Sequence, residues 1–169
     1  MRSHPKGFTI IELLLYLAIS AIILLATSLF LSTLLQSRIK NQTVAEVEGQ
    51  GLQVMQLITQ TVRNVDTIIS PTIGTTGASL SVNTSVSGNN PTIFDLNSGV
   101  VQIKEGAAVA VPLTNARVVV SDLAFFNLSR ASTPGAVKVQ FTITAVNNSG
   151  RNEYSYTKTF VGSAALRQP

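Results

Sequence analysis

The residues GFTIIELLLYLAISAIILLATSLFLSTLL, at positions 7–35, decide the organisation of this chain of 169 residues. Between Phe8 and Leu35 the only formally charged side chain is Glu12. A helix over this stretch of about 28 residues would be roughly 42 Å long, at about 1.5 Å per residue. The hydrocarbon core of a bilayer is about 30 Å thick, so the stretch predicts a membrane-spanning helix.

The start of this segment differs from a secretory signal peptide. Such a peptide has an apolar region of about 7–15 residues, closed by small residues before a cleavage site on the far side. Here the apolar run is longer, no small-x-small site ends it, and a short polar head stops at Gly7. A carboxylate costs about 2.5–3.5 kcal/mol near the bilayer centre and less near the interface, which indicates that Glu12 has a polar partner.

The sequence Gly7–Leu13 resembles the class III signal of type IV prepilins and type II secretion pseudopilins, with glycine, then phenylalanine, then glutamate at the fifth position after the glycine. The resemblance implies that residues 1–7 form a leader. It implies that a membrane-embedded prepilin peptidase cleaves between Gly7 and Phe8, and that the new amino group of Phe8 is methylated. It also implies that Glu12 lies near the amino group of a first mature residue, its own or a neighbour's, and so promotes subunit assembly.

The same resemblance implies a location and a set of partners. Arg2 and Lys6 precede the apolar run while Arg38 and Lys40 follow it, so the positive-inside count is nearly balanced. The resemblance, and not the charge count, implies a single pass through the cytoplasmic membrane with the amino terminus inside. The implied partners are other pilin or pseudopilin subunits, the peptidase, and the membrane with its assembly platform. After assembly, the carboxyl-terminal domain would belong to an extracellular or periplasmic filament.

Composition disfavours several other functions. The net charge is +4 and the pI is about 9.8, yet only 12% of residues are charged and no Lys/Arg cluster occurs, so the sequence carries no specific nucleic-acid signal. There is no cysteine, and the single histidine, His4, lies in the leader. The acidic residues are dispersed. We therefore predict no catalytic residue, no metal site and no cofactor.

Residues 36–69 predict an amphipathic continuation of the helix, so that one helix would run from Phe8 to Ile69. Gly49 and Gly51 indicate either a bend or a close backbone approach, and Pro71 ends the helical pattern. Apolar or small residues recur at spacings of three and four, as expected for a face that packs on a sheet: Val44, Val47, Gly51, Met55, Ile58, Val62, Val65 and Ile69.

Residues 72–169 predict a β-rich globular domain with Asn- and Gly-containing turns. The clearest strand is Val137–Ala145, with a partner at Tyr154–Val161 in which Tyr154, Tyr156 and Phe160 face the core. Shorter strands are predicted at 80–86, 92–96, 100–104, 108–113, 117–120 and 123–127. Strands that follow a helix favour an α+β class. Together with the signal, this order is similar to the pilin fold: a long amino-terminal helix packed on a carboxyl-terminal antiparallel sheet.

Two functions remain open at this point. The first is a minor pilin or pseudopilin, incorporated at or near the tip of a type IV pilus or of a secretion or competence filament. The order of elements loosely resembles J-type minor pseudopilins and PilW-like minor pilins. The alternative is a single-pass, membrane-anchored extracytoplasmic binding protein that does not polymerise. That alternative predicts no cleavage after Gly7 and no requirement for Glu12. An enzyme is disfavoured because no nucleophile motif occurs.

Overall fold

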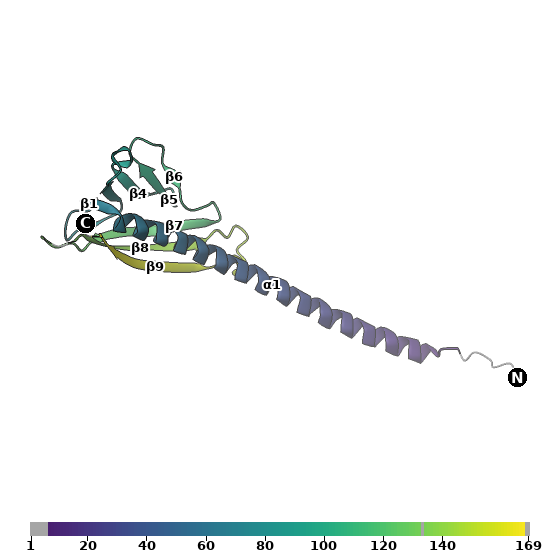
Figure 1. Cartoon of the computed structure of the whole chain (residues 1–169). Coiled ribbons are helices and arrows are strands. Elements are labelled where there is room, and N and C mark those ends of the chain that lie inside the picture. The colour runs from purple at the N-terminus through teal and green to yellow at the C-terminus, as the bar shows by residue number, and fades with distance from the viewer. Residues whose placement is uncertain (1–6, 133, 168–169) are drawn as a thin grey trace. The chain divides into compact units, whose positions relative to one another are not determined.

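The computed structural model describes residues 7–132 and 134–167, and it divides the chain into two units, Met1–Ile39 and Lys40–Pro169. The helix α1 (Ile10–Arg63) contributes residues to both units (Figure 1). In the second unit, strands follow the helix and pair antiparallel. The fold is therefore α+β and pilin-like, with a long amino-terminal helix packed against an antiparallel β domain, as the sequence predicted.

The antiparallel strands form two sheets. A five-stranded sheet has the order β1-β3-β4-β5-β6, and a four-stranded sheet has the order β2-β7-β8-β9. The strands are β1 (Val65–Ser70), β2 (Thr76–Gly77), β3 (Leu80–Thr84), β4 (Thr92–Asn97), β5 (Val100–Glu105), β6 (Val111–Pro112), β7 (Val118–Asn127), β8 (Ala136–Ala145) and β9 (Thr157–Ala165). Two 3₁₀ turns, η1 (Ser87–Asn89) and η2 (Asn152–Tyr154), lie in connections.

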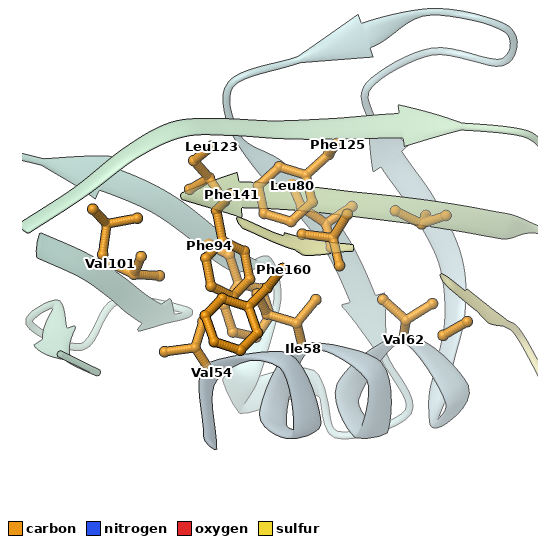
Figure 2. Packing of buried hydrophobic residues seen from close by; sticks show 14 of the residues in the cluster. Val54, Ile58, Val62, Leu80, Phe94, Val101, Leu123, Phe125, Phe141 and Phe160 are labelled. Carbon is orange, nitrogen blue, oxygen red and sulfur yellow. The ribbon is translucent and has the colours of Figure 1, made fainter. Parts of the chain in front are cut away.

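One hydrophobic core joins the second half of α1 to both sheets (Figure 2). Burial alternates along β8, where every second side chain from Val137 to Ile143 is buried, as expected for a strand with one face on the core. The core aromatic residues are Phe94 from the larger sheet and Phe125, Phe141 and Phe160 from the smaller one. The helix contributes Val47, Gly51, Val54, Ile58 and Val62.

The predicted end of the helix was wrong. The helix ends at Arg63, and Val65–Ser70 form β1, which pairs with β3. The spacing of Val65 and Ile69 continues the helical period, but the run Val-Asp-Thr-Ile-Ile-Ser is rich in β-branched residues, which favour strands. Pairing with β3 satisfies the backbone groups of this run that face β3. Ile69 is 48% exposed and therefore does not belong to the core face.

Several strand predictions also need correction. The separate strands predicted at 117–120 and 123–127 form one strand, β7, with a register shift between Ser121 and Ala124. Between these two residues, Asp122 has a positive φ of 55°, as in a β-bulge. The predicted strand 108–113 is reduced to Val111–Pro112, and its first residue belongs to a turn in which the Ala108 N–H donates to the Glu105 carbonyl.

The last strand begins later than predicted, at Thr157. Of the three aromatic residues expected in the core, Phe160 is buried and stacks on Phe141 with ring centroids 5.4 Å apart. Tyr156 packs against the core while remaining partly exposed. Tyr154 is also partly exposed, but it lies in η2 and outside the core cluster.

The helix and β9 run side by side in the same direction, and they approach closely at two glycines. A Cβ on Gly51 would lie 2.1 Å from a ring carbon of Phe160. At the second contact the glycine lies on the strand and the side chain on the helix: a Cβ on Gly162 of β9 would lie 2.4 Å from the sulfur of Met55. Gly51 therefore marks a close approach, the second of the two predicted alternatives, whereas a Cβ on Gly49 would meet nothing within 4 Å.

Two glutamates of α1 connect the helix to the β domain through polar contacts. Glu46 Oε1 accepts hydrogen bonds from Asn115 Nδ2 at 2.7 Å and from Gln50 Nε2 at 2.6 Å. These bonds hold the pKa of Glu46 below its usual range, Asn115 contributing most. Glu48 Oε1 accepts bonds from Lys158 Nζ at 2.7 Å and Tyr156 Oη at 3.1 Å. Lys158, followed by Tyr156, lowers the pKa of Glu48.

We expect these contacts to make the stability of the second unit depend on pH. Because the folded state lowers both carboxyl pKa values, their contribution is fully present above the unfolded value of about 4.3 and is lost as the pH falls through the folded values. Thermal unfolding of the full chain in detergent micelles checks this. When the pH is lowered from about 6 to about 3, the melting temperature of the double variant Glu46→Gln, Glu48→Gln should fall less than that of the wild type. Equal losses would contradict the assignment.

Candidate functional site

The start of α1 is held by a reciprocal pair of hydrogen bonds between Thr9 and Glu12. The Glu12 N–H donates to Thr9 Oγ1 at 3.3 Å, and the Thr9 N–H donates to Glu12 Oε2 at 3.5 Å. The Leu13 N–H donates to the Thr9 carbonyl at 3.1 Å and closes the first helical turn. This is a capping box, in which two backbone N–H groups that have no partner within the helix are satisfied by side chains.

Tyr16 adds a second contact to the same carboxylate. Its hydroxyl donates to Glu12 Oε1 at 3.4 Å, one helical turn further on. The ring of Tyr16 also lies edge-on to the ring of Phe8, with centroids 6.1 Å apart and an interplanar angle of 78°. Both oxygens of Glu12 thus have partners, and Tyr16 links the carboxylate to Phe8.

The peptide bond between Gly7 and Phe8 lies outside the helix, which begins at Ile10. Phe8 is 75% exposed, and a Cβ on Gly7 would meet no atom within 4 Å. Gly7 and Phe8 are both exposed, so the bond between them lies at the surface of the described residues. The rest of the predicted leader, residues 1–6, lies outside the described part of the chain, as does His4.

The surface around Glu12 is apolar. Ile10, Ile11 and Leu13 are between 60% and 81% exposed, and large aliphatic side chains continue to be exposed as far as Leu35. Among the described helices, α1 is the one that is long and apolar enough to cross a membrane. A surface of this kind is stable in lipid or against other apolar helices, and there a lone carboxylate favours a cationic or hydrogen-bonding partner.

The sequence predicts Gly7, Phe8 and Glu12 as site residues, and these remain predictions; sequence reasoning did not point to Thr9 and Tyr16, which the structure places in contact with Glu12. The signal for Thr9 was present, because Thr-x-x-Glu before an apolar run is the sequence pattern of a capping box. Tyr16 follows Glu12 by four residues, the spacing that brings side chains together on one helix face. Among the described residues, no group of three or more His, Cys, Asp or Glu side chains is placed to hold a metal ion.

Comparison with known proteins supports one family. Residues 2–28 match the prokaryotic N-terminal methylation motif. No curated protein and no solved structure matches the chain. The motif is the class III signal of type IV pilins and pseudopilins, and it supports the resemblance of this chain to that family. Such a signal implies processing by prepilin peptidase and assembly with other pilin subunits, and together with the apolar helix it fits a membrane-anchored structural subunit.

Proposed function

We propose that this chain is a minor pilin or pseudopilin with a structural rather than an enzymatic role. Prepilin peptidase cleaves it between Gly7 and Phe8, the new amino group of Phe8 is methylated, and the chain enters a pilus or pilus-like filament through residues 8–35. Its amino terminus lies in the cytoplasm, its β domain lies outside the cytoplasmic membrane, and the subunit occupies a position at or near the filament tip.

The observation that carries this proposal is the placement of Glu12. Its carboxylate is the one charge in a long apolar surface, and Oε2 already accepts the N–H of Thr9, the residue after Phe8. Cleavage would create an amino group at Phe8, one residue from this contact. An ammonium group and a carboxylate brought together in an apolar surrounding offset each other's cost of leaving water. Glu12 can therefore pair with the amino group of its own chain or of a neighbouring subunit.

The exposed Gly7–Phe8 bond supports the processing step. It lies outside the helix between two exposed residues, so a peptidase can bind it in an extended form. The minor role is supported by α1, which continues without proline through residues 10–63. Many major pilins, which the signal also resembles, carry a helix-breaking proline partway along this segment.

Intact mass and amino-terminal sequencing of the protein from membranes of its native host test the proposal. We expect a chain that begins at N-methylated Phe8. A chain that keeps residues 1–7 beside an active prepilin peptidase would contradict it and would favour the membrane-anchored binding protein that does not polymerise.

A further inference from the structure

The outer edge of β9 presents a row of unpaired backbone groups. β8 and β9 pair without a register shift from Ala136↔Ala165 to Thr144↔Thr157. Just beyond the two ends of this ladder, the Ala145 N–H donates to the Tyr156 carbonyl, and the Leu166 N–H donates to the Gly135 carbonyl. In an antiparallel pair, hydrogen-bonded and non-bonded residues alternate. The even-numbered residues of β9 therefore bond to β8, and the odd-numbered residues direct their N–H and C=O groups outward.

These outward residues share one chemistry. All five have exposed, uncharged side chains that are small or β-branched: Thr157, Thr159, Val161, Ser163 and Ala165. Within the part of the chain that the structure describes, none of them bonds through its backbone to a segment beyond β9. The one charge in the strand, Lys158, is engaged by Glu48 of α1. The edge therefore has neither a proline nor a free charge to oppose pairing.

The other sheet edges carry the protection that β9 lacks. β6 has two residues and ends in Pro112. β2 also has only two residues. β1 has register shifts on both sides of Thr67–Ile68 and an exposed Asp66. Short strands, prolines, bulges and charges are the usual means by which a protein prevents its sheet edges from pairing. β9 is the long, regular edge among them, and its outward N–H and C=O groups are suited to pair with a partner backbone in extended form.

Antiparallel pairing of β9 with the same strand of a second copy is disfavoured by direction. A two-fold axis at Val161 would make the strands antiparallel. The helix runs along β9 in the same direction, with Lys40 Nζ 3.4 Å from the carbonyl of Asn152 and Gly51 at Phe160. The Lys40 residues of the two copies would therefore lie at opposite ends of the joined sheet. Two chains anchored in one membrane cannot both enter such a sheet from the same side.

We propose that β9 is an assembly edge that accepts an extended, uncharged strand from a neighbouring filament subunit of different sequence. This inference rests on the proposed function and specifies one of its contacts. The added strand pairs with the outward groups of residues 157–165 and extends the four-stranded sheet. Small or β-branched side chains on that strand fit beside Thr159, Val161 and Ser163.

Substitutions of Val161 in the full chain, expressed in its native host, test this contact. Val161→Pro removes an outward N–H without removing a bond to β8, and Val161→Lys places a charge on the edge. Val119 is an equally suitable exposed valine on β7, 48% exposed against 57% for Val161. The Val120 N–H donates to the Gly99 carbonyl, away from β8, so the backbone groups of the neighbouring Val119 point toward β8. Val119→Lys therefore places the same charge on a strand position that offers no free edge, and it is the matched control.

We expect all variants to begin at Phe8 and both Val161 variants to enter filaments at least about tenfold less than wild type, with Val119→Lys unchanged. Should Val161→Pro disturb the melting curve, Val161→Lys still decides. Normal incorporation of Val161→Lys would overturn the assembly edge while leaving the proposed function intact. Equal losses for Val119→Lys and Val161→Lys would overturn it too. A wild-type chain that keeps its leader would refute the proposed function, and the inference with it.

Discussion

Glu12→Gln is expected to reduce incorporation into filaments by at least about tenfold while leaving the chain in the membrane and processed at Phe8. Glutamine has nearly the same shape as glutamate and still offers an oxygen to the N–H of Thr9 or to the hydroxyl of Tyr16. It lacks the charge that would pair with the amino group of a first mature residue. An unpaired charged group costs about 2.5–3.5 kcal/mol near the centre of a bilayer, and each 1.4 kcal/mol is about a factor of ten.

Two control variants separate this charge from the hydrogen bonds around it. Thr9→Ala removes the capping hydroxyl, which typically costs about 0.5–2 kcal/mol of helix stability, but it keeps the carboxylate. Tyr16→Phe removes the hydroxyl that donates to Glu12 Oε1 and keeps the ring that contacts Phe8. Both should enter filaments at levels much closer to wild type than Glu12→Gln does. The amount of each variant in sheared filaments, relative to membranes, gives the comparison.

The opposite ranking would contradict an electrostatic role. If Glu12→Gln assembled normally while Thr9→Ala and Tyr16→Phe failed, residue 12 would act through its hydrogen bonds to Thr9 and Tyr16 and not through its charge. Normal assembly of all three variants would remove Glu12 from the mechanism altogether. Mass spectrometry of each membrane-bound chain must accompany these measurements, because a variant that is not cleaved after Gly7 fails at an earlier step.

The first part of the chain was predictable because its information is local. The apolar run, Glu12 and Gly7 lie close together in sequence, and each has a meaning that needs no tertiary contact. The end of α1 was not predictable in this way. Val65 and Ile69 continue the helical spacing, and only pairing of residues 65–70 with β3 decides for a strand. Local pattern and distant pairing conflict there, and the pairing prevails.

The contacts that fix the helix to the β domain also depend on distant residues. Glu46 meets Asn115, which is 69 residues away in sequence, and Glu48 meets Lys158, which is 110 residues away. No local pattern pairs these residues. The division of the strands into two sheets is likewise set by which edges find partners. Sequence reasoning correctly gave a helix followed by antiparallel strands and the main hairpin, β8 with β9, but it missed β1, β2 and the number of sheets.

Gly51 illustrates the same limit and leads to the second large effect. The sequence allowed a bend or a close approach at Gly49 and Gly51, and only the position of Phe160 distinguishes them. We expect Gly51→Ala to destabilise the second unit and Gly49→Ala to stabilise it. Replacing glycine by alanine within a helix gains roughly 0.5–1 kcal/mol where there is room for the methyl group. At Gly49 there is room, since nothing lies within 4 Å of the new Cβ.

At Gly51 the new methyl group would lie 2.1, 2.2 and 2.6 Å from three ring carbons of Phe160. The ring cannot simply rotate away, because it is only 7% exposed and stacks on Phe141 at an interplanar angle of 20°. Overpacking of this kind costs about 1–3 kcal/mol and here exceeds the helix gain. A change of about 1 kcal/mol corresponds to a few degrees in melting temperature for a domain of this size.

Thermal unfolding of Gly51→Ala and Gly49→Ala, each in the full chain in detergent micelles, measures the difference between their melting temperatures. The gain in helix propensity is common to both variants and cancels in this difference. The double variant Gly51→Ala, Phe160→Leu should recover part of the loss beyond the sum of the single changes, because leucine lacks the ring atoms that clash. An equal rise in melting temperature for Gly51→Ala and Gly49→Ala would contradict the close packing of Phe160 on the helix. Phe160 and Val161 are consecutive in β9. That result would therefore also mean that packing of Phe160 on the helix does not hold β9 in the position proposed for the assembly edge.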